Sequence, residues 1–386
     1  MIKTLTAHTT QIDDVNAAVS EILEQLDLPN SLKKNSIGFI TCYPEFIDTG
    51  IVKALSEKFP FDTLGVTTFA CSAPGKIGHL ALIVSVLTSD DVIFSSSVTN
   101  PLNAKNLKTE IETAYKAAAA KLPGKASMII LMSPFTFDFS GDDTIRELDA
   151  LTGGIPVFGT NAIDDNPDYK NAKAFYNGKE NPTTLSMALF YGNINPSFSL
   201  GNVSDQNLLP QKAVITSSKG NTIETINNIP AMDYMQSLGL APDGQMISFA
   251  NVPLIVDFND GTQPAARVII GTTPEKHIIC AANVPQGTIL SIGSMNQDEV
   301  LRVSSKMFEN AAGKENKNGA FVFSCLARNS ALGLDADSEM EAMQKTLNGK
   351  LPFFMGYSGG EFCPVRTPDG KIINRFHNDT IVICQF

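Results

Sequence analysis

The sequence predicts an α/β protein of two domains, in which internally duplicated strand–helix–strand–hairpin units form mixed β-sheets flanked by helices. Three observations carry this prediction. Short apolar, β-branched runs alternate with amphipathic stretches of helical period. The alternation occurs three times, each time with a glycine near the end of the second strand. The chain has 386 residues, 43% of them hydrophobic, which is enough for two packed domains.

The first unit follows an N-terminal tail that contains His8. Its apolar positions recur at helical spacing and then at strand spacing, and Pro60 ends one of its helices. The elements predicted here are a helix over residues 12–26, strands over 36–42 and 63–68 with a helix over 50–59 between them, strands over 80–87 and 91–98 joined by a hairpin turn, and a helix over 101–121.

The same order of elements returns twice. In the second unit Asn177-Gly178 lies between apolar runs and predicts a tight hairpin turn. The second unit comprises strands over 128–133 and 155–159, a helix over 142–151, and hairpin strands over 173–176 and 184–190. The third comprises strands over 320–324 and 351–356, a helix over 338–347, a turn at 368–370 and a last strand over 378–384.

A stretch of different character lies between the second and third units. It consists of short strand patterns separated by turns rich in Gly, Asn and Pro. The elements predicted here are two strands within 211–226, a helix over 230–238, strands over 249–258, 265–271, 277–281 and 288–292, and a helix over 296–308. Residues 193–211 lack periodicity, so we expect the boundary there, giving domains of residues 1–205 and 206–386.

Composition excludes several classes of function. The 29 basic and 40 acidic residues give a net charge of -11, which disfavours binding to a phosphate backbone. The apolar runs are far shorter than the ~20 residues that span a bilayer, and the first residues lack the apolar core of a secretory signal. The six cysteines form no CxxC pair, which favours reduced thiols. We therefore expect a cytoplasmic protein without nucleic-acid or membrane partners.

Three polar loops follow equivalent predicted strands: residues 71–75 (CSAPG), 160–165 (TNAIDD) and 357–362 (YSGGEF). Loops of this kind can present backbone N–H groups to a polar ligand, and α/β sheets bind ligands beyond the carboxyl ends of strands. We expect the three loops to meet at one cleft and line a shared pocket. The alternative is that their glycines serve only turns or close packing.

Three side chains near the C-terminus are candidates for chemistry. Arg328 would clamp a carboxylate of a ligand, or pair with an acidic residue of the protein. Cys325 with His377 and Glu361 has the residue types of a thiol nucleophile site, but a buried structural cysteine gives the same pattern. His377 is a candidate ligand for haem iron or zinc, or a structural histidine.

Other patterns argue against common ligands. No GxGxxG or GxxxxGK[ST] sequence follows a predicted strand, so nucleotide binding is unsupported. Asp164, Asp165 and Asp168 form an acidic loop without the spacing of an EF-hand, which suggests solvation more than calcium binding.

Taken together, these motifs resemble those of the FIST family (F-box and intracellular signal transduction), which has N- and C-terminal domains. The resemblance covers roughly residues 35–384. The matching segments are FACSAPGKI (69–77), VFGTNAIDD (157–165), IETINNIPAMDYMQSLG (223–239), FSCLAR (323–328), FMGYSGGEF (354–362) and FHNDT (376–380).

The resemblance implies a bacterial stand-alone sensor that binds a small ligand without catalysis, with amino acids as the ligand class. It also implies a separate histidine kinase, cyclic-di-GMP enzyme or chemoreceptor as partner. The residues expected to bind the ligand are Cys71, Ser72, Gly159, Thr160, Asn161, Cys325, Arg328, Gly356, Tyr357, Ser358, Gly360, Glu361, His377 and Asn378.

Two alternatives stay open. Similar proteins include some that bind haem and sense nitric oxide, for which His377 is the candidate ligand here; otherwise no cofactor is expected. The other alternative is a cysteine-dependent hydrolase or transferase that uses Cys325 or Cys71.

Overall fold

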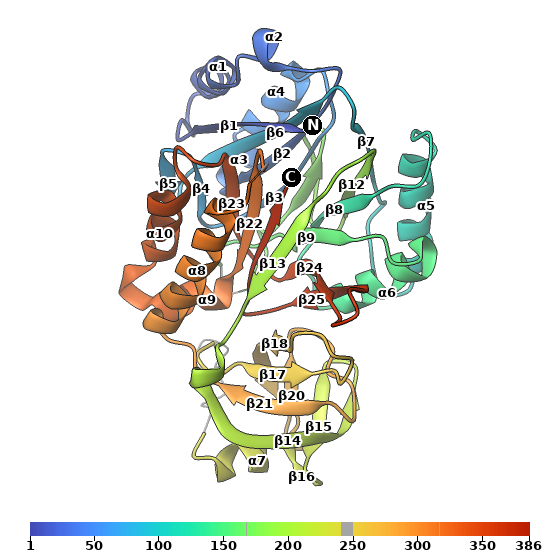
Figure 1. Cartoon of the computed structure of the whole chain (residues 1–386), viewed down its shortest axis with the longest axis vertical. Helices are drawn as coiled ribbons and strands as arrows, with labels where there is room; N and C mark the ends of the chain where they lie inside the picture. The colour runs from blue at the N-terminus through green and yellow to red at the C-terminus, as the bar shows by residue number, and fades with distance from the viewer. Residues whose placement is uncertain (167, 241–249, 316) are drawn as a thin grey trace.

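The computed structural model describes residues 1–166, 168–240, 250–315 and 317–386. Its described strands form three six-stranded sheets and one eight-stranded sheet. The three six-stranded sheets and their flanking helices make up the upper part of Figure 1, and the eight-stranded sheet lies below them. The predicted α/β class, with mixed sheets and duplicated units, is confirmed.

The upper part, here called the body, contains three repeats of one unit. The first repeat contains β1 (Lys3–Thr9), α1 (Val15–Leu26), α2 (Leu28–Ser31), β2 (Asn35–Cys42), α3 (Glu45–Asp48), α4 (Ile51–Lys58), β3 (Thr63–Thr67), β4 (Cys71–Ala73), β5 (Lys76–Gly78) and β6 (Leu82–Ser89). The second contains β7 (Ile93–Val98), α5 (Leu107–Ala119), β8 (Met128–Ser133), α6 (Gly141–Thr152), β9 (Val157–Asn161), β10 (Ala174–Tyr176), β11 (Lys179–Asn181) and β12 (Ser186–Tyr191).

The third repeat is interrupted after its first strand by the eight-stranded sheet. It contains β13 (Ser197–Gly201), α8 (Gln297–Ala312), β22 (Ala320–Cys325), α9 (Leu326–Leu332), α10 (Ser338–Leu347), β23 (Phe353–Ser358), β24 (Glu361–Arg366), β25 (Ile372–His377) and β26 (Ile381–Gln385). The interrupting segment, here called the insert, contains β14 (Leu208–Lys219), β15 (Thr222–Ile226), β16 (Ile229–Pro230), α7 (Ala231–Ser237), β17 (Leu254–Asp257), β18 (Ala265–Arg267), β19 (Ile269–Thr272), β20 (Ile278–Cys280) and β21 (Ile289–Gly293).

The three sheets of the body share one strand order. In each sheet two parallel strands lie at the centre: β2 with β3, β8 with β9, and β22 with β23. The full orders are β1-β6-β2-β3-β10-β11, β7-β12-β8-β9-β24-β25 and β13-β26-β22-β23-β4-β5. The central strands are buried along most of their length, as their near-continuous apolar runs predict.

The repeats exchange hairpins in a cycle. The hairpin β4–β5 of the first repeat pairs with β23 of the third, and β24–β25 of the third pairs with β9 of the second. The hairpin β10–β11 of the second repeat completes the cycle by pairing with β3 of the first. Each loop after a second central strand must therefore cross from one sheet to another. This crossing brings three loops distant in sequence to the centre of the body.

Side-chain caps fix the starts of three helices of the body. Asp14 accepts a hydrogen bond from the amide of Ala17 at the start of α1, and Asn296 accepts one from Glu299 at the start of α8. Ser140 and Asp143 form a reciprocal capping box on α6. The helices cover the outer faces of the three sheets, with α1–α4, α5–α6 and α8–α10 as three groups around the body (Figure 1).

Several local predictions are wrong. The predicted N-terminal tail is strand β1, paired with β6. The predicted hairpin over residues 80–98 does not form, because β6 and β7 lie in different sheets. Asn177 and Gly178 do form the predicted turn with positive φ, but it joins β10 to the short β11, and β12 pairs elsewhere. Residues 193–211, predicted to be a linker, include β13.

The predicted boundary near residue 205 lies where the chain leaves β13 and enters the insert. In the fold, however, the predicted C-terminal domain is divided between the insert and the body. Its first part forms the insert, and residues from α8 onward return to complete the third sheet of the body. No helix in the described ranges has the length and apolarity that crossing a membrane requires.

Candidate functional site

The three crossing loops contact one another through backbone hydrogen bonds. Ile163 N donates to Thr67 O at 3.1 Å, which joins the second loop to the first. Gly359 N donates to Asn161 O at 3.2 Å, and Tyr357 N donates to Ala70 O at 3.1 Å. The structure therefore brings the second and third predicted loops together with residues 67–70, while residues 71–75, predicted to be the first loop, are strand β4 and its turn into β5.

These hydrogen bonds also change the expected chemistry. The amides of Asn161, Ile163, Tyr357 and Gly359 already donate to carbonyl oxygens of the protein. A buried amide with a partner has no free donor for a ligand. The loops consequently hold the repeats together, and the predicted ring of free amides around a ligand does not exist at these four positions.

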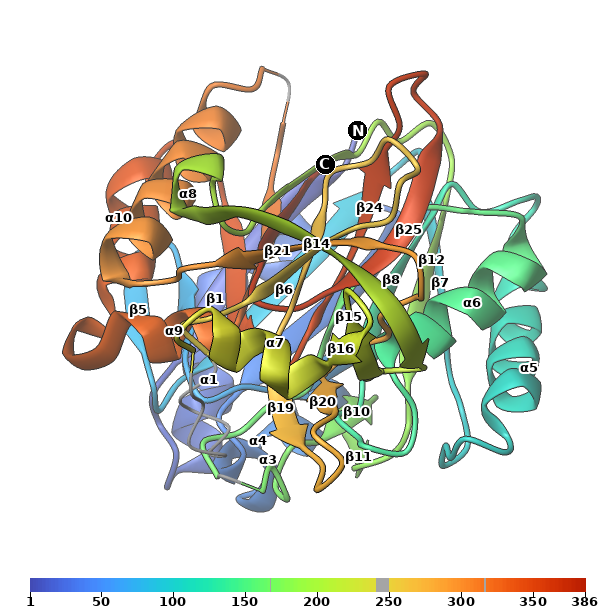
Figure 2. The ribbon, with the colours of Figure 1, turned by 90° about the horizontal axis from the view of Figure 1, so that it is seen from below.

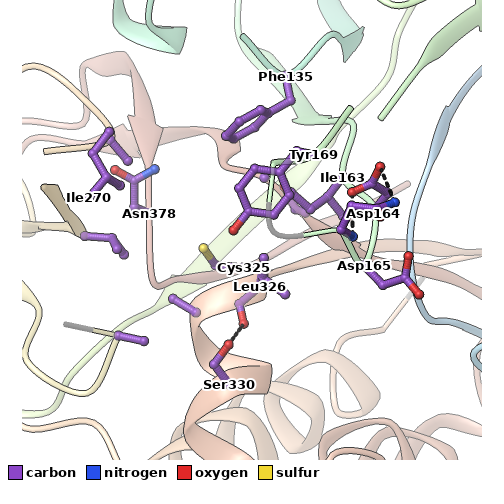
Figure 3. Close-up of a pocket in the computed structure, with 17 residues that line it drawn as sticks. Phe135, Ile163, Asp164, Asp165, Tyr169, Ile270, Cys325, Leu326, Ser330 and Asn378 are labelled. Carbon is purple, nitrogen blue, oxygen red and sulfur yellow. Dashed lines mark hydrogen bonds between the residues drawn. The ribbon is translucent and has the colours of Figure 1, made fainter. Parts of the chain in front are cut away.

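A cavity of about 490 Å³ opens beside this meeting point, between the body and the insert. Ligand sites in proteins commonly have this size and are mostly apolar with a few polar groups. The described residues that line it are Phe135, Ile163, Asp164, Asp165, Asn166, Tyr169, Ala250, Val268, Ile270, Ala281, Cys325, Leu326, Ala327, Ser330, Ser358, Gly359 and Asn378. Figure 3 shows most of them around Tyr169. The loop of residues 70–76, which we expected in the lining, is not part of it.

The walls come from both parts of the molecule. From the body come the second and third crossing loops and the first turn of α9; from the insert come Ala250, Val268, Ile270 and Ala281. Phe135 packs edge-on against Tyr169 with ring centroids 4.8 Å apart. Most of the wall is therefore aliphatic or aromatic.

Three predicted site residues line this cavity: Cys325, Ser358 and Asn378. Cys325 ends β22 directly before α9, and its sulfur points toward the Tyr169 hydroxyl in Figure 3. Asn378 is 2% exposed and donates through Nδ2 to the carbonyl of His377. Its Oδ1 has no hydrogen-bond partner among the described residues.

Two buried carboxyl groups lie behind these three residues. Glu361 and Asp379 are fully buried; both carboxyl oxygens of Asp379 are without a hydrogen-bond partner in the described chain, whereas Glu361 lies close to Ser358 and Cys325. Burial raises the pKa of Asp379 to about 7, although Arg328 partly offsets this effect. Burial also raises the pKa of Glu361 well above its usual range. Cys325 lies close to both carboxyl groups, and its pKa is raised by burial and then by their charges.

Arg328 does not line the cavity. It is fully buried, and its Nη2 donates to Glu339 Oε1 at 2.8 Å and to Ser304 Oγ at 2.6 Å. Glu339 also accepts from Ser324 Oγ at 2.7 Å. The alternative reading of Arg328, as the partner of an acidic residue of the protein, is the one the structure supports. The ion pair ties α9 to α10 and α8.

His377 does not fit the role of haem ligand. Its ring is fully buried in the sheet, Nε2 lies 3.0 Å from the carbonyl of Cys363, and the residue does not line the cavity. Burial lowers the pKa of the imidazole to about 3, so it is neutral. No histidine is among the described lining residues.

The remaining predicted residues are structural in their surroundings. Cys71 and Ser72 lie in β4, where Ser72 Oγ donates to Lys76 O and accepts from Gln344. Thr160 and Ser358 contact each other through their hydroxyl oxygens at 2.7 Å. The other members of this group, all buried and outside the cavity lining, are Gly159, Asn161, Gly356, Tyr357 and Gly360.

Gly159 supports the close-packing alternative. A Cβ at this position would lie 2.2 Å from the carbonyl oxygen of Leu131 on the neighbouring parallel strand. Gly65, at the equivalent place of the first repeat, would put its Cβ 2.3 Å from Ile40 O. Glycine is thus required where these parallel strands approach each other.

Sequence reasoning missed most of the cavity wall. Residues such as Val268, Ile270 and Ala281 have no chemical signature that separates a cavity wall from a core. Asp164 was assigned to a solvated loop, but it is fully buried and accepts from the amide of Asn171 at 2.6 Å. Its place in the crossing loop TNAIDD was the one signal that pointed to the site.

The comparison with solved structures gives distant matches. One is the crystal structure of cyanuric acid hydrolase from A. caulinodans, with a TM-score of 0.39 and 8% identity, covering 100% of this chain and 98% of that one. A second cyanuric acid hydrolase structure has a TM-score of 0.35 and 9% identity, with the same coverage. No argument about function follows from similarity at this level. None of the curated proteins matches the chain.

The comparison with protein families is specific. The FIST N domain matches residues 36–229 and the FIST C domain matches residues 231–364. The first match ends within the insert and the second begins there, so the family's division runs through the eight-stranded sheet. FIST domains are associated with sensing in signal transduction. This chain belongs to the FIST family, with both of its domains.

Proposed function

We propose that this protein is a sensor that binds a small molecule in the cavity between body and insert, and that binding changes how these two parts pack. The observation that carries the proposal is that the residues lining the cavity come from both the body and the insert. Ile163 and Cys325 come from the body, whereas Val268 and Ile270 come from the insert. A ligand that contacts both parts favours the arrangement in which both contacts exist.

The signalling partner that responds to ligand binding is proposed to be a separate protein: a histidine kinase, a cyclic-di-GMP enzyme or a chemoreceptor. Such a partner would recognise the surface where body and insert meet, because this is the surface that the ligand changes. The resemblance to sensory proteins suggests amino acids as ligands, and they belong in any first screen.

We propose that the protein acts without catalysis. The strongest nucleophile candidate is Cys325, which is 5% exposed. Burial and the charges of Glu361 and Asp379 raise the pKa of its thiol far above neutrality, and a neutral thiol is a weak nucleophile. No histidine lines the cavity in the described ranges, so the base that a thiol nucleophile requires is not among these residues.

Ligand-dependent melting tests the proposal. Amino acids, amines, carboxylic acids, alcohols and haem would be screened against purified protein, and a cavity ligand at about a hundredfold excess over Kd should raise the melting temperature by about 3 °C. Ser330 is exposed on α9 at the cavity wall, so Ser330→Trp should fill the mouth and abolish the shift.

The matched control is Ser237→Trp. Ser237 is also an exposed helical serine whose hydroxyl donates to a carbonyl of its own helix, but it lies outside the cavity lining. This variant should keep the shift. A panel without any effect on the unaltered protein, or a shift that survives in Ser330→Trp, would contradict the proposal.

A further inference from the structure

The ionisable side chains that line the cavity include carboxyl groups but no basic group among the described residues. Asp164 and Asp165 line it, whereas no Lys, Arg or His is among the described lining residues. Asp164 already accepts hydrogen bonds from two backbone amides, and Asp165 accepts one from Tyr43 at 2.7 Å. These two carboxylates give the cavity a negative potential, but their hydrogen bonds are largely satisfied within the protein.

Unsatisfied acceptors gather at one corner of the cavity, formed by Cys325, Ser358 and Asn378. Asn378 Oδ1 has no partner among the described residues although the side chain is nine-tenths buried and lines the cavity. Asp379 lies directly behind this corner with both carboxyl oxygens unpaired in the described chain, and Glu361 lies beside it, close to Ser358 and Cys325. Buried acceptors without donors are costly, so their presence in a cluster calls for a donor from outside the chain.

The protein's own cation does not meet this need. Arg328 influences both carboxyl groups, but the hydrogen bonds of its Nε and Nη2 go to Glu339, Ser304, Ser324 and the carbonyl of Val300, and its Nη1 donates to none of the described residues. One guanidinium thus faces three carboxyl groups, and the charge of Glu339 alone balances it. A metal ion is not indicated, because no group of three ligating side chains in the described ranges is arranged to hold one.

We propose that the cavity binds an organic cation, a protonated amine or amidine on a compact apolar body, with its charged end at the Cys325–Ser358–Asn378 corner. This inference rests on the proposed function. The N–H groups of such a ligand would donate to Asn378 Oδ1, and its positive charge would compensate the carboxylate of Asp379 behind it. Its apolar body would contact Ile163, Ile270 and the rings of Phe135 and Tyr169. An acid has no cationic partner among the described lining residues.

Matched probes test the charge. Isopentylamine and 2-phenylethylamine would be compared by calorimetry with the alcohols and carboxylates of the same bodies, isopentanol and 4-methylvalerate, 2-phenylethanol and 3-phenylpropionate. We expect each amine to bind at least about tenfold more tightly than its alcohol, and the carboxylates not to bind. Binding of an alcohol or a carboxylate as tight as that of the amine overturns the cation assignment and leaves the sensory cavity standing. Absence of binding by every probe, whatever its charge, overturns both.

The variant Asp379→Asn tests the corner. Asp379 has a φ of 48°, which asparagine tolerates, so the backbone is kept and only the charge is removed. Amine affinity should fall about tenfold, while affinity for 2-phenylethanol stays the same, a result that a merely structural defect would not give. Unchanged amine affinity in this variant overturns the proposal.

The pH dependence supplies an independent measurement. The charged groups that face Asp379 are Arg328, Glu339, Glu361 and Cys325. As the Asp379 carboxyl ionises, the corner becomes more negative, so amine affinity should rise from about pH 6 to about pH 8 in the unaltered protein and stay flat in Asp379→Asn. A rise of equal size in the variant contradicts the assignment of the charge to Asp379.

Discussion

Asp379 carries an ionisable group in a place that disfavours its charge. Burial raises the pKa of this carboxyl to about 7 from a usual value of 3.8. Between these two pH values the folded protein therefore binds a proton that the unfolded chain has lost. It follows that this group lowers the stability of the folded state as the pH rises from about 4 to about 7.

Asp379→Asn should remove this pH dependence. At about pH 4 the variant and the unaltered protein should unfold at the same urea concentration, because a neutral amide replaces a neutral carboxyl. At about pH 8 the variant should be more stable by about 4 kcal/mol, since the charged carboxylate no longer has to be buried. Urea unfolding at both pH values measures the difference, and a variant less stable at pH 8 would contradict the raised pKa.

Cys325 should react slowly despite its place in a cavity wall. Its raised pKa leaves little thiolate at neutral pH. Iodoacetamide should therefore label Cys325 at least about tenfold more slowly than it labels the same cysteine in the denatured protein. Peptide mass spectrometry of the alkylated protein reads this rate. Rapid, selective labelling of Cys325 would instead favour the cysteine-dependent enzyme.

At the scale of elements, the parallel strand pairs depend on close backbone approach. Gly159→Ala should destabilise the protein by about 3 kcal/mol, because the new Cβ would overlap the carbonyl of Leu131 and force β9 away from β8. Gly271→Ala is the control: it also lies in a strand, and its Cβ would meet only Ile279 at 3.9 Å. Equal stability losses in thermal unfolding would show that packing at Gly159 is not the cause.

The sequence was a good guide to elements whose pattern is local. The apolar runs at β2, β8 and β22 and the amphipathic repeat of α10 predicted the units, because each pattern reports burial of one segment. The exchange of hairpins was not predictable in the same way. Nothing in residues 71–78 says that they pair with β23 of the third repeat, since strand pairing depends on contacts distant in sequence.

The same limit applied to the candidate site. Convergence of the segments after the second central strands could be predicted from their equivalent places in the units, and Cys325, Ser358 and Asn378, which were predicted to bind a ligand, line the cavity. Arg328 and His377 were not distinguishable from ligand-binding residues, because only the fold shows that Glu339 and the carbonyl of Cys363 are their partners. The aliphatic residues that the insert contributes to the cavity wall could not be predicted from the sequence, because only the three-dimensional fold brings them to the cavity.

At the scale of the molecule, a few polar contacts hold the insert against the body. Arg267 of the insert is fully buried, and it donates to Phe376 O at 3.0 Å and lies 3.5 Å from Asp142. Asp142 also accepts from the amide of Asn283 at 2.8 Å. Arg267 also donates to Asn283 O and Ala266 O of the insert, so this one side chain joins the insert to Phe376 and Asp142 of the body (Figure 2 shows the insert side).

Arg267→Ala should loosen the insert without unfolding the body. Removal of the buried cation leaves Asp142 without its ion-pair partner and the carbonyl of Phe376 without this donor, so we expect limited proteolysis to cleave within residues 208–293 about tenfold faster. Lys276→Ala, which breaks the exposed pair of Lys276 with Asp233 inside the insert, is the control and should not change the rate. Unchanged cleavage in Arg267→Ala would mean that other contacts hold the insert.

Hydrogen exchange in the presence of ligand tests the central claim, that a small molecule bridges body and insert. With the tightest binder of the screen at saturation, amide exchange should slow in peptides from both sides of the cavity, namely residues 163–169 and 325–330 of the body and 265–281 of the insert. Protection confined to one side, or located instead in residues 198–200 and 364–366 around the second, smaller cavity, would contradict the account.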